Sequence, residues 1–212
     1  TWQELASGYL LGEISYRCNL QPDFEKFVDR PHPDAMINNF TRLQPTVTKL
    51  GITFDSNQDD GQLIQDLFDW LGKEETDMTL FFRSLSSIVV HSEPAAMPEA
   101  TRHASYATPS ATHIDAGVEW LRRWWQRTRR EQVKPEAIAQ SLDRTNPKYV
   151  LRNWLAQTAI DAAHEGDLSV LKRLLDVMWR PFDEQPDHAD LAQKRPEWAR
   201  HKPGCSALSC SS

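Results

Sequence analysis

Apolar residues recur at helical spacing along most of this chain. The clearest face combines Leu63, Ile64, Leu67, Phe68 and Leu71. Side chains three and four residues apart lie on the same side of a helix, so this spacing predicts a helix, and Asp59 and Asp60 are candidates to cap its start. A second apolar group at residues 80–85 predicts another helix, which begins near Thr76.

Three more helices are predicted in the second half of the chain. The first covers residues 114–133, with Ile114, Val118, Leu121 and Trp125 at spacings of four, three and four. Residues 148–165 and 168–179 form the other two, which meet at Gly166 and Asp167. Glycine accepts the left-handed backbone of a helix end and aspartate caps a helix start, so this pair predicts a tight helical hairpin. In its second helix, a core-facing stripe is expected from Leu171, Leu174, Leu175 and Met178.

Two segments lack such periodicity. Residues 91–113 are rich in Ala, Ser, Thr and Pro, which predicts a flexible insertion. Residues 181–212 are expected to form an extended tail with short turns, because prolines forbid a long helix there. These prolines are Pro181, Pro186, Pro196 and Pro203. No alternating run predicts a strand, so the fold class is mainly α.

Composition and charge narrow the function classes. A formal net charge of −6 argues against general nucleic-acid binding, which depends on Lys and Arg. Residues 119–131 interleave Trp and Arg, but we expect Leu121 and Trp125 to face a core while the arginines face water or cover the indoles. No stretch approaches the roughly 20 apolar residues of a membrane span, so no membrane association is expected. The three cysteines are too few for a disulfide framework and favour a reducing compartment.

Familiar nucleotide and metal motifs are missing from the sequence. The eight glycines form neither G-x-G nor G-x-x-x-x-G-K, the loops that cradle phosphates. Neither D-F-G nor H-R-D occurs, and the histidines lack the H-x-x-x-H spacing of a zinc site. An autonomous nucleotide enzyme is therefore disfavoured. The hairpin at residues 159–176 is similar to one ankyrin-type helix pair, which leaves a helical protein-binding adaptor without catalysis as the alternative, although repeat proteins need about three such units.

A more specific pattern occupies residues 145–184. It consists of an N-P-x-x-x-L-R-N-x-x-A-Q segment, a helix, Gly-Asp, a leucine-rich helix and a Pro-Phe-acidic turn. Its residues are Asn146, Pro147, Leu151, Arg152, Asn153, Ala156, Gln157, Gly166, Asp167, Pro181 and Phe182. Residues 76–85, the segment around Trp198 and the Ser-Cys-Ser-Ser ending add further matches. In this order they resemble the C-terminal part of the selenoprotein O family, over residues 37–212.

This resemblance implies a protein-kinase-like fold and the transfer of AMP from ATP to hydroxyl side chains of other proteins, with Mg²⁺ as cofactor. The family's glycine-rich loop and its ATP-binding and metal-binding residues lie upstream of the similar part. No catalytic, cofactor-binding or metal-binding residue is therefore assigned in this chain, and the chain alone is expected to be inactive.

The resemblance also divides the chain. Residues 37–90 are expected to be a helical part of the C-lobe and residues 114–180 a helical C-terminal subdomain, while residues 1–36 are not placed. The residues expected to pack behind the catalytic core are Trp154, Leu155, Leu171 and Leu174, and Arg152 and Asn153 are expected to hydrogen-bond neighbouring loops.

Cys210 is third from the end, where some animal members of the family carry selenocysteine. Oxidation with a distant cysteine would tie down the tail, so redox control is one expectation, and a functionally silent thiol is the alternative. Cys205 is a second thiol that could pair locally. By resemblance, the complete protein would act on protein substrates, in mitochondria if eukaryotic or in cytoplasm if bacterial. The sequence leaves the oligomeric state open.

Overall fold

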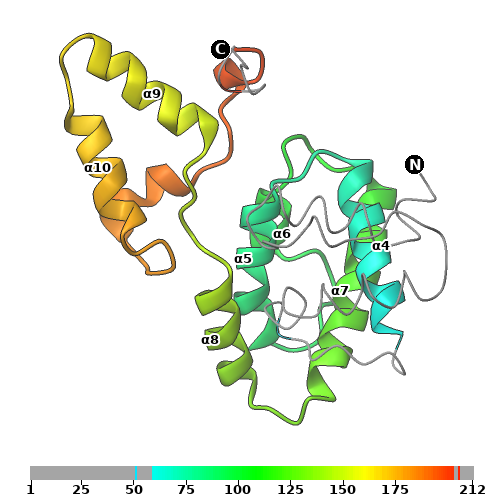
Figure 1. Cartoon of the computed structure of the whole chain (residues 1–212). Coiled ribbons are helices and arrows are strands. Elements are labelled where there is room, and N and C mark those ends of the chain that lie inside the picture. Colours follow the sequence, from blue (N-terminus) through cyan, green and yellow to red (C-terminus); the bar gives the residue numbers. More distant parts are fainter. Residues whose placement is uncertain (1–50, 52–58, 203–204, 206–212) are drawn as a thin grey trace, which may run out of the picture.

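The structure is a computed structural model that describes residue 51, residues 59–202 and residue 205. In these residues the order is α4 (Asp60–Lys73), α5 (Met78–Val89), α6 (Glu99–His103), α7 (Ala111–Arg129), α8 (Pro135–Thr145), α9 (Asn153–His164), α10 (Ser169–Met178) and the 3-10 helices η2 (Pro186–Ala192) and η3 (Glu197–Ala199). The described part contains no strand, and its one isolated bridge joins Thr76 to Ser105. The prediction of a mainly α structure is confirmed for this part (Figure 1).

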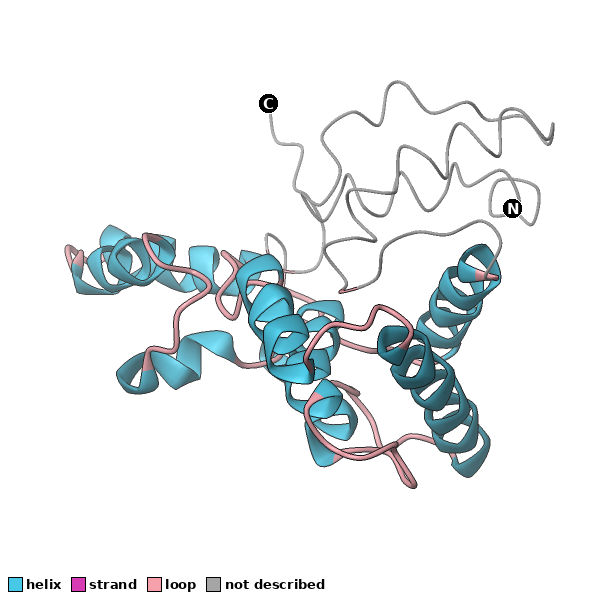
Figure 2. Ribbon diagram, turned by 90° about the horizontal axis from the view of Figure 1, so that it is seen from below, coloured by secondary structure: helices cyan, strands magenta, loops and turns pink. Residues whose placement is uncertain are grey.

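The helices form two units, each with its own apolar core. We call residues 59–146, which carry α4 to α8, the first unit, and residues 147–202, which carry α9, α10, η2 and η3, the second unit. In Figure 1 the hairpin of α9 and α10 lies beside the larger first unit. Figure 2 shows the same helical arrangement from below.

The core of the first unit is rich in aromatic rings. Phe81 of α5 lies between two tryptophans, with ring centroids 5.4 Å from Trp70 and 5.9 Å from Trp120. The indole N–H of Trp70 donates to the carbonyl of His113 at 2.9 Å, and that of Trp120 donates to the carbonyl of Leu63 at 2.7 Å. Both indoles are buried without losing a hydrogen bond, so they contribute their apolar area to α4, α5 and α7 at little polar cost.

Helices α4 and α7 approach closely at Gly117. A Cβ atom there would lie 2.4 Å from Cε of Met97 and 2.7 Å from Cζ2 of Trp70, so no larger residue fits without a shift of the core. Met97 belongs to residues 91–113, the predicted flexible insertion, and it is buried together with Thr101 and Ala104 of the same segment. These three residues anchor the segment on the first core. Their irregular spacing among Ala, Ser and Pro gives no periodic signal, which is why the sequence pattern did not reveal them.

The second core lies between the two helices of the hairpin and η2. Its buried members are Tyr149, Leu155, Ala159, Leu174, Val177, Leu191 and Ala192. Gly166 has φ of 87°, and Oδ1 of Asp167 accepts a hydrogen bond from the backbone N–H of Ser169 at 2.8 Å. The predicted tight hairpin is confirmed. The N-cap position of α10 is occupied by Leu168, so Asp167 accepts this hydrogen bond from one residue before the N-cap.

Four details of the prediction are wrong. Asp59 is the N-cap of α4 with φ of 54°, but its side chain makes no capping hydrogen bond, and Asp60 is buried against Arg127 instead of capping. Leu171 and Leu175 were expected to face a core and are 41% and 54% exposed, whereas Leu155 and Leu174 are buried. Leu174 and Val177 face the second core, so Leu171 falls on the flank of α10.

The described part of the tail follows the short-turn prediction. Pro186 is at the start of η2 and Pro196 is the N-cap of η3, as expected where proline ends regular helix. Leu191 and Ala192 pack into the second core. Beyond them the chain passes the first unit, and its arginines contact acidic side chains there.

Candidate functional site

Charged side chains from both units meet between them, and we call this set the junction. At its centre, Arg152 holds Asp77 with two hydrogen bonds, from Nη1 to Oδ2 at 2.5 Å and from Nη2 to Oδ1 at 3.0 Å. Asp77 also caps α5, because its Oδ1 accepts from the backbone N–H of Leu80 at 3.1 Å. Its side chain is buried. A bidentate pair of this kind is strong and directional, and removal of one partner leaves a buried charge.

Tyr106 completes the centre of the junction. Its hydroxyl donates to Oδ2 of Asp77 at 3.2 Å and accepts from the backbone N–H of Arg195 at 3.3 Å. Burial raises the pKa of Tyr106, and the Asp77 carboxylate raises it further. The phenol therefore stays protonated and acts as a fixed hydrogen-bond donor between the first unit and the tail.

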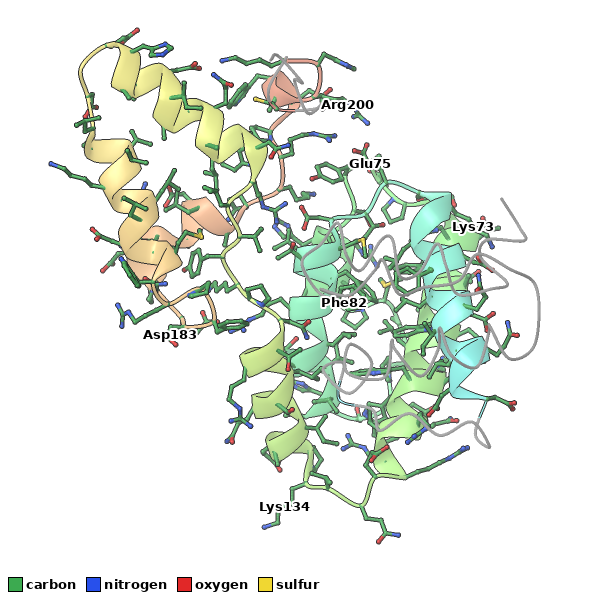
Figure 3. The ribbon with its side chains drawn as sticks, in the orientation of Figure 1. Lys73, Glu75, Phe82, Lys134, Asp183 and Arg200 are labelled. Carbon is green, nitrogen blue, oxygen red and sulfur yellow. The ribbon has the colours of Figure 1, made fainter. Side chains whose placement is uncertain are left out.

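The tail makes a second contact at Glu75. Nη2 of Arg195 donates to Oε1 of Glu75 at 2.6 Å, and Arg200 pairs with Oε2 of the same carboxylate. Figure 3 shows Glu75 and Arg200 near each other where the tail passes the first unit. Nearby, Nζ of Lys194 donates to the carbonyl of Ser105 at 2.5 Å. The two contacts to Glu75 join residues 120 and 125 positions apart in sequence, and the contact from Lys194 to Ser105 joins residues 89 positions apart.

A third group of contacts in the junction is centred on Arg83 and Glu184. Nη1 of Arg83 donates to the carbonyls of Asp143 and Asn146, at 2.8 and 2.9 Å, and thereby satisfies the end of α8. Glu184 accepts from Nη2 of Arg83 at 2.9 Å and also pairs with Lys148. The hydrogen bond from Lys148 is the main cause that lowers the pKa of Glu184, and Arg83 lowers it further.

The junction explains some of the family-pattern residues. Arg152 bonds the first unit, as expected of a residue that reaches neighbouring loops, and the carbonyls of Asn146 and Pro181 accept hydrogen bonds from Arg83 and from the backbone of Lys148 and Tyr149. Pro147 lies in the loop before α9, and Asn153 begins that helix with its side chain exposed.

Other pattern residues lie away from the junction. Gln157 donates to Asp161 one turn further along α9, at 2.7 Å, and Ala156 is half-buried on the same helix. Three large apolar residues of the set are exposed, namely Leu151, Phe182 and Trp198. Trp198 makes an edge contact with Trp154 at a centroid distance of 6.4 Å. The sequence reasoning missed Asp77 and Glu75 as partners, because their arginines are distant in sequence.

The arginines of the Trp-Arg helix, α7, contact other residues of the protein, and one of them is buried. Arg127 is buried and holds Asp60 at 2.7 and 3.0 Å, and Arg123 pairs with Asp66 at 2.6 Å. The guanidinium of Arg129 lies 4.2 Å from the ring centroid of Trp125, so it covers the indole as predicted. A hollow of about 240 Å³ beside this helix is lined by Asp59, Gln62, Leu63, Arg123, Gln126, Arg127 and Arg130.

The acidic side chains of the described part of the chain do not gather into a metal-binding cluster. No group of three His, Cys, Asp or Glu side chains gathers among them in a way that would hold a metal ion. The carboxylates nearest to clustered arginines already form ion pairs with them, as Asp60 and Asp66 do. None of the described helices combines the length and apolar content that a membrane crossing requires.

The cysteines contribute one described thiol. Cys205 is buried and free of any disulfide, and its backbone N–H donates to the carbonyl of Lys202 at 3.1 Å. Cys210, the other predicted redox residue, lies outside the described residues.

Comparison with known proteins identifies the protein family to which the chain belongs. The family model for "Protein adenylyltransferase SelO" matches residues 22–179. The chain belongs to this family of protein nucleotidyltransferases. Among its curated relatives, the "Protein nucleotidyltransferase YdiU" of Nitrosospira multiformis is 45% identical, over 77% of this chain and 33% of that protein. The proteins of the same name from Rhodopirellula baltica and Tolumonas auensis are 42% and 45% identical, over 77% and 73% of this chain.

The chain covers only part of the length of each relative. The matches cover 33% of the Rhodopirellula protein and 29% of the Tolumonas protein. The chain therefore spans about a third of the length of the curated relatives that it matches. The predicted resemblance to the selenoprotein O family is confirmed.

Proposed function

We propose that this chain is the C-terminal helical part of a protein adenylyltransferase that transfers AMP from ATP to hydroxyl side chains of other proteins. In this proposal the complete protein has a kinase-like fold, and the two helical units extend its C-lobe. The observation that carries the proposal is the family match over residues 22–179, together with relatives about three times as long as the shared part.

The junction gives these units a physical role. Arg152, in the family pattern, and Asp77, in the matching segment at residues 76–85, are held together by two hydrogen bonds across 75 positions of sequence. Such a pair fixes the angle between the units, because a bidentate contact tolerates little rotation. The proposed role is a rigid support behind the catalytic part, while ATP and Mg²⁺ bind elsewhere in the complete protein. The isolated chain would then be inactive.

Two regulatory aspects belong to the same proposal. Oxidation of Cys210 against a distant cysteine would restrain the tail, and the thiol of Cys205 offers a local partner. The compartment would be the mitochondrion in a eukaryote and the cytoplasm in a bacterium. A Cys210→Ser variant of the complete protein whose AMP transfer is the same in oxidant and in reductant would remove the redox idea.

The test compares the isolated chain with the complete natural protein. Each is incubated with Mg²⁺ and either ATP labelled at the α-phosphate or ATP labelled at the γ-phosphate, and label retained on protein is measured. We expect α-label transfer by the complete protein and none by the isolated chain, once circular dichroism shows that the chain is folded. Transfer of γ-label would indicate a kinase. Transfer of α-label by the isolated chain would place the nucleotide site within these residues.

A helical adaptor without catalysis is the outcome if the complete protein transfers neither label. That result would contradict the proposed function while leaving family membership and the described fold intact.

A further inference from the structure

The loop between α4 and α5 pairs with the segment that follows α6. We call residues 74–77 and 104–106 the paired loops. Two backbone hydrogen bonds join them, of 2.8 and 3.0 Å, on either side of the isolated bridge between Thr76 and Ser105. Pairing over so few residues is marginal in water on its own, so other contacts must hold the paired loops in place.

The first turns of two helices depend on the paired loops. Asp77 caps α5, since its side chain accepts from the backbone N–H of Leu80. Ser110 caps α7 in the same way, by accepting from the backbone N–H of His113 at 3.2 Å, and its hydroxyl donates to Oε1 of Glu74 at 2.6 Å. Each cap satisfies a backbone N–H that has no partner within its helix. Opening of the paired loops would therefore release the starts of α5 and α7 together.

The tail holds both members of the paired loops at once. We call residues 194–200 the clasp. Arg195 and Arg200 pair with the carboxylate of Glu75 in the first loop. Nζ of Lys194 donates to the carbonyl of Ser105 in the second loop at 2.5 Å. The clasp thus crosses the pairing and bonds to each side of it.

The clasp is packed on these loops as well as ion-paired with them. The guanidinium of Arg195 lies 4.9 Å from the ring centroid of Tyr106, and its backbone N–H donates to the hydroxyl of the same residue at 3.3 Å. Ala199 of η3 is fully buried, although it belongs to neither apolar core. Next to it, Trp198 contacts Trp154 of α9, so the clasp also remains attached to the second unit. Figure 3 shows Arg200 at the place where the tail passes the first unit.

We propose that the clasp is a conformational latch on the first unit. While residues 194–200 are seated, the paired loops stay closed and the first turns of α5 and α7 stay ordered. When the tail leaves, all three become mobile together. Seating of the clasp and closure of the paired loops are linked equilibria, so each stabilises the other by the same free energy. Any event that displaces the tail is thereby transmitted to the first unit through Glu75. The latch concerns the described residues alone and does not depend on AMP transfer by the complete protein.

The test measures amide hydrogen exchange in the complete natural protein by mass spectrometry, because exchange reports local opening. The double variant Arg195→Gln/Arg200→Gln removes both charges that face Glu75. The matched control is Arg173→Gln/Arg180→Gln, which removes the same charge from ion pairs within the second unit. Each peptide's rate is divided by its rate in the unfolded protein, so the substitutions themselves do not bias the comparison.

The expected effect is moderate, because the ion pairs of the clasp are partly exposed. In the clasp variant we expect exchange to be about fivefold faster in residues 194–201 and also about fivefold faster in residues 103–114. In the control variant we expect less than a twofold change in residues 103–114. The second segment is not altered in either variant, so its acceleration would be transmitted from the tail.

Each result decides the inference. Faster exchange in the tail with unchanged exchange in residues 103–114 would overturn it, because the clasp would then lie on the paired loops without holding them. Equal acceleration in the control would overturn it too, since loss of charge in general would be the cause. No change in either segment would show that these ion pairs do not seat the tail.

A measurement without substitutions covers the case in which the clasp variant fails to fold. Salt screens partly exposed ion pairs, so between about 0.05 and about 0.5 M NaCl the exchange of residues 194–201 and of residues 103–114 should rise by the same factor. A rise in the tail alone, or no rise in either segment, would contradict the latch.

Discussion

The two helical units differ in how completely they cover their own apolar residues. In the first unit, Trp70, Phe81 and Trp120 are enclosed on all sides and the indole N–H groups of both tryptophans are hydrogen-bonded. In the second unit, a small core stands beside an exposed stripe that ends at Trp179. The first unit thus derives its stability from its own packing, whereas the second depends more on what it contacts. The junction is one such contact.

The largest expected effect is the loss of an aromatic ring from the first core. Phe81→Ala removes a fully buried side chain between two indoles, so we expect the free energy of unfolding to fall by about 3–5 kcal/mol. Urea denaturation monitored by circular dichroism measures it. The matched control from the second unit is Phe182→Ala, which removes a side chain that is 40% exposed just beyond α10 and should cost less than about 1 kcal/mol in this chain. Equal losses would contradict the comparison.

The next effect breaks the junction. Arg152→Met leaves Asp77 buried without its guanidinium, and loss of one partner of a buried pair costs about 3 kcal/mol or more. Because Arg152 makes the most buried of the ion pairs between the two units, we expect the second unit to unfold at lower urea than the first, which would split one transition into two.

Asp77→Asn is the companion variant for this test. The amide oxygen still accepts from Leu80 at the start of α5, so the cap is retained while the charge is lost. In the double variant the loss should be smaller than the sum of the two single losses, because both remove the same interaction. Strict additivity would show that the two residues act independently.

The sequence predicted the helices better than it predicted their contacts. Periodicity located α4, α5, α7, α9 and α10, and Gly166 with Asp167 located the hairpin, because these signals are local. Partners such as Asp77 and Arg152 lie 75 positions apart, and a single sequence carries no signal that pairs them. Leu171 was misplaced for a related reason. The spacing of leucines along a helix does not indicate which side of a wide apolar face packs against the core.

A third prediction tests the hairpin that supports the second unit. Gly166 has φ of 87° and open space where a Cβ would be, so Gly166→Ala suffers backbone strain without a clash. We expect a loss of about 1 kcal/mol. Gly72→Ala is the matched control, since Gly72 is helical with equally open space, and alanine there should stabilise α4 by about 0.5–1 kcal/mol. Thermal unfolding should therefore shift in opposite directions, and a shift in the same direction would contradict the assignment of strain.

The smallest effect is a pH dependence confined to the first unit. His113 is buried, its ring stacks on Trp70 at a centroid distance of 4.6 Å, and neither ring nitrogen has a hydrogen-bond partner among the described residues. Burial lowers the pKa of His113 below its ordinary value of 6.5, the Glu74 carboxylate opposes this, and Lys73 adds to it. The unfolded chain then binds more protons than the folded one below about pH 6.5, so stability should fall as the pH falls through that value and on into the lower pKa of the folded state.

His113→Phe keeps a flat ring on Trp70 and removes the titration, so its urea midpoint should change less between pH 7.5 and pH 5.5 than that of the unaltered chain. The titration of Glu74 does not contribute between pH 7.5 and pH 5.5. Its hydrogen bond from Ser110 lowers its pKa below the ordinary value of 4.5, so its stabilising contribution is lost only at more acidic pH. If both chains lost stability equally over this range, the dependence would originate in groups other than His113, and burial of this imidazole would not be its cause.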